Sequence, residues 1–263
     1  MVPVLLNSSF REKVWGSTRL SPWYPDSTEK IGEVWFEATP PLPLLLKFIF
    51  TSEALSVQVH PNDEYAGLHE NSRGKTEMWH ILRADPGAKI AIGLREEMTA
   101  QRLRDAAQSG EIEKLLNWVE VKPGDTFHIP AGTIHAIGAG IVLCEIQQNS
   151  DVTYRLYDYG RPRELHLDRG VEVSIRIPWT PDVPPRGLLA SCQYYATESL
   201  AVSSQFHYQP DPERFHVLIV LEGTGMMGGE AYRLGQAWLV AKQTHSFDIA
   251  PSSPTRILRT YVP

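Results

Sequence analysis

The fold is decided by Gly124-Asp125-Thr126-Phe127-His128-Ile129-Pro130-Ala131-Gly132-Thr133-Ile134-His135. The glycine and the acid at its start form a turn, and residues 126–129 are typical of a short strand. Pro130 and Gly132 favour a second tight turn, after which His135 begins another strand. This order directs one imidazole inward from the start of a strand, as a metal site in a β-barrel requires. The simpler alternative is a hairpin whose histidine has no special role.

A strand that can supply partners for His135 lies upstream, at residues 55–61 (Leu-Ser-Val-Gln-Val-His-Pro). Polar and apolar residues alternate along it, which predicts a strand. Because successive side chains of a strand point to opposite faces, Ser56, Gln58 and His60 share one face. If that face is buried, a glutamine and a histidine two positions apart can both reach one ion.

A second strand-like run, residues 74–82, places Lys75, Glu77 and Trp79 on one face. A single glutamate is usually solvated, and a single histidine usually satisfies a hydrogen bond in the core. The convergence of these residues with the turn before His135 nevertheless predicts a metal site. Two imidazoles and a carboxylate suit zinc and also non-haem iron, and a glutamine adds a neutral oxygen. The predicted ligands are Gln58, His60, Glu77 and His135.

These motifs carry a resemblance to known families. The stretch before His135 is similar to the second conserved motif of the cupin superfamily, with Ala139 where an asparagine is usual. The whole order, from about Trp15 to Arg161, resembles the short, bacterial-type members of the type I mannose-6-phosphate isomerases (phosphomannose isomerases). The segments that carry this similarity are Val14-Trp15-Gly16, Ile31-Gly32-Glu33-Val34-Trp35, Leu46-Lys47-Phe48, residues 55–63, residues 74–79, residues 130–137 and residues 145–155.

The resemblance implies a mainly β protein built on a cupin jelly-roll barrel. It also implies an aldose–ketose isomerase that interconverts mannose 6-phosphate and fructose 6-phosphate through an enediol(ate) intermediate. The implied substrate is therefore a phosphorylated hexose, and the implied cofactor is one divalent metal ion, with zinc as the expected identity. Such an ion can orient the sugar oxygens and polarise the carbonyl group.

The resemblance also assigns roles to single side chains. Arg155 is expected to stabilise the enediolate, because a guanidinium is permanently charged and its donors form a fork. Lys75 and Glu145 are both candidates for the proton carrier, and Asp151 is a third. Short bacterial members often carry a histidine just before this lysine, but Gly74 stands there in this chain, which argues against a ring-opening histidine at that position. The expected substrate-binding residues are Lys47, Ser56 and Asp151.

Two domains are expected along the chain. Residues 1–177 are predicted to form the catalytic, metal-binding cupin domain, interrupted by a helical insertion at about residues 95–118. Thr99 is the expected N-cap of the first inserted helix. Prolines within residues 177–185 indicate a linker, since proline cannot donate to a β-ladder. Residues 186–263 are predicted to form a C-terminal cupin-like domain.

This C-terminal domain is expected to lack a metal site. Residues 215–225 resemble the beginning of a second cupin-like barrel, and Gly235 begins the match to its second motif. Counted from that glycine, the motif's proline, glycine and histidine positions hold Ala241, Gln243 and Ser246. These residues cannot hold an ion in the way expected of His135, so we expect a structural role or a wall of the substrate cleft.

Composition argues against several other classes of protein. The chain has 263 residues and a net charge of −6, and it lacks the dense lysine–arginine cluster of a nucleic-acid surface. Its longest apolar run, residues 42–50, is too short to span a bilayer, and its first residues do not form a signal-peptide pattern. Its two cysteines are too few for a disulfide framework. We therefore expect a cytoplasmic protein, monomeric or weakly dimeric, without a nucleic-acid or membrane partner.

Two other functions fit the predicted ligands. A non-haem iron cupin dioxygenase could use His60, Glu77 and His135, although many such enzymes carry another histidine where Gln58 stands. A non-catalytic sugar-binding cupin would need the metal and the sugar site alone. Metal analysis, oxygen uptake and exchange of the sugar's C1/C2 proton would separate these functions from an isomerase.

Overall fold

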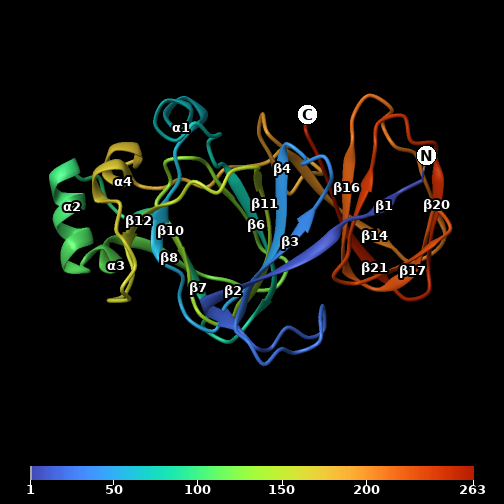
Figure 1. Ribbon diagram of the computed structural model, residues 1–263, viewed down its shortest axis with the longest axis horizontal. Coiled ribbons are helices and arrows are strands. Elements are labelled where there is room, and N and C mark those ends of the chain that lie inside the picture. Colours follow the sequence, from blue (N-terminus) through green and yellow to red (C-terminus); the bar gives the residue numbers. More distant parts are fainter. Residues whose placement is uncertain (1) are drawn as a thin grey trace.

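Short alternating runs separated by glycine and proline turns form two β-barrels in the computed structural model, which describes residues 2–263. The barrels lie side by side, and most of the helices lie on the far side of the first barrel from the second (Figure 1). The protein is thus mainly β, as expected. Among the described residues, no helix is long and apolar enough to cross a membrane.

The first barrel consists of a six-stranded and a five-stranded antiparallel sheet. The six-stranded sheet contains, in order of pairing, β2 (Asn7–Ser17), β3 (Ile31–Glu37), β4 (Leu44–Phe50), β11 (Ile141–Gln148), β6 (Glu77–Ala84) and β9 (Thr126–Ile129). The five-stranded sheet contains β12 (Tyr154–Tyr157), β5 (Val57–Val59), β10 (His135–Ile137), β7 (Lys89–Leu94) and β8 (Leu116–Glu120). Since β6 belongs to one sheet and β5 and β10 to the other, their polar residues can meet inside the barrel.

The second barrel is built in the same way from the C-terminal third of the chain. One sheet contains β1 (Val4–Leu5), β19 (Ala237–Val240), β16 (His216–Glu222), β21 (Thr255–Tyr261), β14 (Ala196–Val202) and β13 (Ala190–Ser191). The other contains β15 (Phe206–Tyr208), β20 (Phe247–Pro251), β17 (Thr224–Met227) and β18 (Glu230–Arg233). The N-terminal strand β1 pairs with β19, so the start of the chain contributes to the second barrel before the first barrel begins.

Within residues 2–263, four helices accompany the first barrel. They are α1 (Asp63–Glu70), α2 (Ala100–Ser109), α3 (Ile112–Leu115) and α4 (Leu167–Val173). The insertion after β7 contains α2 and α3, and the Thr99 side chain caps α2 by accepting a hydrogen bond from the Arg102 N–H. It ends somewhat earlier than about residue 118, because Trp118 already pairs with Ala91 of β7. The sequence did not predict α1 or α4, both of which are short.

The two barrels share a hydrophobic core. Phe48 of β4 is fully buried in a cluster that also contains Val217 and Ile219 of β16 and Leu258 of β21. Burying a side chain of this size contributes roughly 1.5–3 kcal/mol. Because this cluster contains residues of both barrels, we expect the barrels to fold as one unit. The shared core does not test the expected domain boundary at residues 177–186, so that boundary stays a prediction.

The two barrels also share a hairpin geometry. In the first barrel, Gly124 and Gly132 have positive φ angles of 94° and 87°. At the matching positions of the second barrel, Gly235 and Gln243 have φ angles of 82° and 58°. The turn before β20 thus keeps the left-handed residue that the motif requires, although a glutamine has replaced the glycine. Ser246, at the histidine position, offers no imidazole there.

Candidate active site

The predicted hairpin places His135 at the first position of β10. Strand β9 ends at Ile129, and the Thr133 N–H then donates to the Pro130 carbonyl at 3.1 Å, which closes the turn. The Gly132 N–H donates to the His60 carbonyl at 2.8 Å, so the turn is attached directly to the second histidine. The motif thus does two things: it starts β10 and fixes the His60 backbone beside it.

The strand predicted at residues 55–61 is shorter in the structure, where β5 covers Val57–Val59 and Ser56 and His60 flank it, but the predicted alternation is present. Val57 and Val59 are fully buried in a cluster with residues of α2 and α4, while Gln58 faces the opposite side, beside His135. The Cα atoms of Gln58 and His135 are paired across β5 and β10. The Gln58 amide lies 3.3 Å from His135 Nε2, which is close enough for both side chains to face one ion.

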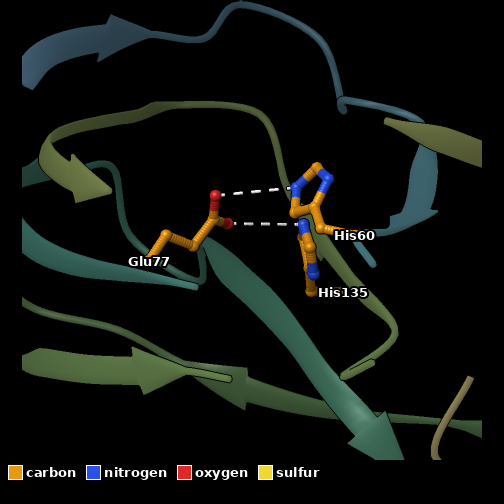
Figure 2. Close-up of side chains that lie close together, drawn as sticks. All are labelled: His60, Glu77 and His135. Atoms are coloured by element: carbon orange, nitrogen blue, oxygen red, sulfur yellow. Dashed lines mark ion pairs between the residues drawn. The ribbon is translucent and has the colours of Figure 1, made fainter. Parts of the chain in front are cut away.

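Three of the four predicted ligands form one buried cluster. The ligand atoms of His60, Glu77 and His135 lie within 4.8 Å of one another, and the three side chains are almost fully buried. Figure 2 shows the Glu77 carboxylate pointing toward both imidazole rings. Its two oxygens lie 3.5 Å from His60 Nε2 and 3.4 Å from His135 Nε2.

Hydrogen bonds set the tautomer of both histidines. His60 Nδ1 lies 2.9 Å from the Val152 carbonyl, and His135 Nδ1 lies 2.8 Å from the Thr133 carbonyl. A carbonyl oxygen only accepts, so each Nδ1 carries the proton and each Nε2 is an unprotonated acceptor. Burial lowers the pKa of His60 well below its usual value and that of His135 to about 4. Both rings are therefore neutral at pH 7, which is the state that binds a metal.

The residues present fit a metal ion. Glu77 Oε1 is buried without a hydrogen-bond donor among the described residues, a costly arrangement unless a cation compensates it. The Lys75 ammonium is the cation nearby: its Nζ lies 3.0 Å from Glu77 Oε2 and 2.9 Å from His60 Nε2. These donors, two imidazoles and a carboxylate, match a zinc or iron site.

A cavity of about 290 Å³ adjoins this cluster. Its walls carry five cationic and three acidic side chains, so the lining is positively charged overall. All of the predicted catalytic and substrate-binding residues line it, together with one predicted ligand: Lys47, Ser56, Gln58, Lys75, Glu145, Asp151 and Arg155. The structure therefore brings together residues that are up to 108 positions apart in the sequence.

Lys47 and Glu145 form a buried ion pair at the cavity. Lys47 Nζ lies 3.0 Å from Glu145 Oε1 and 3.8 Å from Glu33 Oε1. Burial alone would lower the pKa of Lys47, but the two carboxylates outweigh it and raise the pKa above its usual value. The other oxygen of Glu145 accepts a hydrogen bond from Trp79 Nε1 at 2.9 Å. Both ends of this carboxylate are therefore already engaged.

Arg155 differs from the other cations of the cavity. Lys13, Lys47, Lys75 and Arg163 each lie within ion-pair distance of a carboxylate, whereas no carboxylate of residues 2–263 lies that close to Arg155. Its Nη1 donates to the Glu164 carbonyl at 2.7 Å, and its buried Nε has no partner among the described residues. Burial, together with the nearby charge of Arg163, lowers its pKa. A guanidinium with spare donors beside a cavity suits a negatively charged ligand.

Several cavity residues were not predicted as site residues. Lys13, Glu33, Thr153 and Arg163 also line the cavity. Lys13 and Glu33 come from β2 and β3, and their side chains lie 3.4 Å apart. Lys13, Glu33 and Thr153 lie in or next to segments that carry the family resemblance, which was the available signal. Their direction toward the cavity depends on strand pairing, which the sequence does not show.

Position 74 has no room for the histidine that short bacterial members often carry before this lysine. A Cβ atom at position 74 would lie 2.5 Å from both the Asn62 carbonyl carbon and the Asp63 nitrogen. The segment therefore packs against the start of α1 at backbone distance, and any larger residue would force the two segments apart.

This contact gives a stability prediction. Replacing Gly74 with alanine is expected to lower the free energy of unfolding by about 1–3 kcal/mol, the usual cost of overpacking. Replacing Gly67 in α1 is the matched control, since nothing lies within 4 Å of its added Cβ. There alanine should stabilise by roughly 0.5–1 kcal/mol. Denaturant titration measures both, and equal effects at the two positions would contradict the packing described here.

Comparison with known proteins bears on this site. The chain is 35% identical to mannose-6-phosphate isomerase ManA of Bacillus subtilis (strain 168), and the match covers 87% of this chain and 88% of that protein. The chain belongs to the mannose-6-phosphate isomerase family. A second member of the family, from Streptococcus mutans serotype c (strain ATCC 700610 / UA159), is 36% identical over 65% of this chain and 67% of its own length. No protein-family model matches the chain.

Solved structures agree with the family. The crystal structure of the mannose 6-phosphate isomerase from Bacillus subtilis matches with a TM-score of 0.88 at 27% identity over 99% of both chains. A putative mannosephosphate isomerase from Archaeoglobus fulgidus has the same fold, with a TM-score of 0.80 at 21% identity. The mainly β, cupin-type fold is thereby confirmed. As a member of this family the protein is a metal-dependent aldose–ketose isomerase, and neither a dioxygenase nor a binding module is favoured.

Proposed function

We propose that the protein interconverts mannose 6-phosphate and fructose 6-phosphate at the cavity beside the His60–Glu77–His135 cluster. We further propose that Gln58 completes the ligand set and that the ion is zinc. Two neutral imidazoles and a carboxylate support this choice, because zinc combines readily with both ligand types. When bound, the ion supplies a positive charge that orients the sugar oxygens and polarises the carbonyl group.

The reaction needs a group that moves a proton between neighbouring carbons, and Lys75 is the candidate that its position favours. Its Nζ lies within 3.0 Å of ligand atoms and faces the cavity. Geometry decides first which group can transfer a proton. Glu145 is a weaker candidate because Lys47 and Trp79 hold both of its oxygens. Asp151 is exposed on the cavity wall.

Arg155 is proposed to stabilise the enediolate. The intermediate carries negative charge that neither substrate nor product carries at those carbons, so a preorganised cation lowers the barrier selectively. Arg155 can serve in this way because, unlike the other cations of the cavity, it has no carboxylate within ion-pair distance in the described part of the chain.

The substrate phosphate is proposed to bind through the positive charge of the cavity lining. Lys47 and Ser56 remain the proposed contacts, although Lys47 is already paired with Glu145 and Glu33. Lys13 and Arg163 add positive charge to the same cavity. Five cations against three acids leave an excess that suits a dianionic group.

One observation carries the proposal: Lys75, which touches two members of the metal cluster, and Arg155, which has no ion-pair partner among the described residues, line one cavity beside that cluster. A binding module needs neither a proton carrier nor a charge for a transient intermediate. A dioxygenase activates oxygen and has no use for a buried lysine against two of its ligands.

A coupled assay tests this function. Purified protein is expected to form fructose 6-phosphate from mannose 6-phosphate, to lose activity after dialysis against a chelator, and to regain it with added zinc. Metal content is measured on the same samples. Iron content with oxygen uptake, or metal and sugar binding without turnover, would contradict the proposal.

A further inference from the structure

Two consecutive tyrosines of the C-terminal half contact the catalytic barrel. Tyr194 and Tyr195 lie between β13 and β14. The Tyr194 hydroxyl donates to Asp63 Oδ2 at 2.7 Å, and the Tyr195 hydroxyl lies 2.8 Å from His128 Nδ1. One short segment of the second barrel thus makes polar contacts with two separate parts of the first.

Asp63 collects hydrogen bonds from three directions. Besides Tyr194, the Gly74 N–H and Gln148 Nε2 each donate to its Oδ1 at 2.8 Å. Partial burial would raise the pKa of Asp63, but the bonds from Tyr194, Gly74 and Gln148 outweigh it and lower the pKa. The carboxylate is therefore a charged acceptor, and hydrogen bonds to charged groups are the stronger ones.

These bonds fix the backbone on both sides of Lys75. Asp63 holds the Gly74 N–H, and Gln148 Oε1 holds the Thr76 N–H at 2.9 Å. The Lys75 N–H itself donates to the Pro61 carbonyl at 3.0 Å. All three consecutive N–H groups before Glu77 are thus bound, two of them through the pair formed by Asp63 and Gln148.

Tyr195 acts on the opposite side of the same strand. His128 belongs to β9, where it pairs with Met78 of β6, and the neighbouring pair joins Glu77 to Ile129. The segment that carries Lys75 and Glu77 therefore lies between Asp63 on one side and His128 on the other. Each of these two residues is hydrogen-bonded to a tyrosine of the second barrel.

We propose that Asp63 is a positioning residue for Lys75 and Glu77, and that Tyr194 couples the metal-free barrel to the active site through it. The inference rests on the proposed function, since it gives the second barrel a part in the same reaction. Groups behind the direct ligands typically change metal affinity or activity by about 10- to 100-fold. A small displacement of a reacting group also lowers the reaction rate strongly, because the reacting atoms must be closely aligned.

The test removes a single hydroxyl. Tyr194→Phe is expected to lower kcat by about three- to tenfold, the worth of one hydrogen bond, with KM within about twofold of the native value. Transfer of the metal from the protein to a coloured chelator should become about tenfold faster. The control is Tyr65→Phe, which loses a similar hydroxyl-to-carboxylate bond, to Glu172 at 2.6 Å, on the other side of α1.

A double-mutant cycle tests whether Tyr194 acts through Asp63. In an Asp63→Ala background, Tyr194→Phe should have no further effect on kcat or on metal release, because its acceptor is gone. Additive effects would overturn the proposal, as would a Tyr194→Phe variant that differs from Tyr65→Phe only in melting temperature. If Asp63→Ala does not fold, the comparison of the two tyrosine variants still decides.

The readouts separate this inference from the proposed function. Metal release needs no sugar, so it tests the positioning role even if the native protein does not isomerise mannose 6-phosphate. That outcome would end the proposed function alone. An active native enzyme whose Tyr194→Phe and Tyr65→Phe variants match in kcat and in metal release would end the positioning role alone.

Discussion

Replacing His135 with alanine is expected to leave the purified protein with far less than one metal ion per chain and without isomerase activity. The change removes one of the two neutral imidazoles and leaves Glu77 buried with fewer partners. Loss of a ligand opens the coordination shell, so the remaining ligands hold an ion less tightly. Metal analysis after gel filtration and the coupled assay measure the two effects.

His216 offers a matched control for this prediction. It is also a buried histidine on a barrel strand, but its Nδ1 bonds to the Tyr208 hydroxyl and it is not part of the metal cluster. His216→Ala should keep its metal, even if the protein becomes less stable. Full metal content in His135→Ala would show that the ligand assignment is wrong, and equal loss in both variants would attribute the effect to unfolding.

Replacing Arg155 with alanine is expected to lower kcat by about 10²–10³ while metal content and fold stay intact. This is the usual cost of removing one preorganised group that stabilises a developing oxyanion. A lysine at the same position should recover little, because a point charge cannot reproduce the planar fork. Steady-state kinetics with mannose 6-phosphate, together with metal analysis, measure both variants.

The pattern of the change identifies what Arg155 contacts. A rise confined to KM would place it on the substrate phosphate, where it would bind ground state and transition state alike. Unchanged kinetics would remove it from the site. Arg176→Ala is the control, because Arg176 also donates through Nη1 to backbone carbonyls, those of Val171 and Ser174, but lies outside the cavity.

Local patterns predicted a large part of the site. The turn at residues 130–132 is determined by proline and glycine conformations, so its position and the start of β10 at His135 follow from neighbouring residues alone. The alternation at residues 55–61 likewise shows which side of β5 is polar. The same kind of signal was present for α1, whose N-cap Asn62 precedes two acids, but its eight residues show no clear apolar face.

The sequence by itself therefore predicted the turn before His135, the strands on either side of that turn and the polar side of the segment that carries Gln58, because these depend on residues a few positions apart. Only the tertiary structure decided which other groups reach the site. Lys13 reaches the cavity from the second strand, and Tyr194 meets Asp63 across 131 positions of sequence. Both contacts depend on how sheets pair and how the two barrels share a core. A local sequence pattern cannot predict contacts between residues so far apart in the chain.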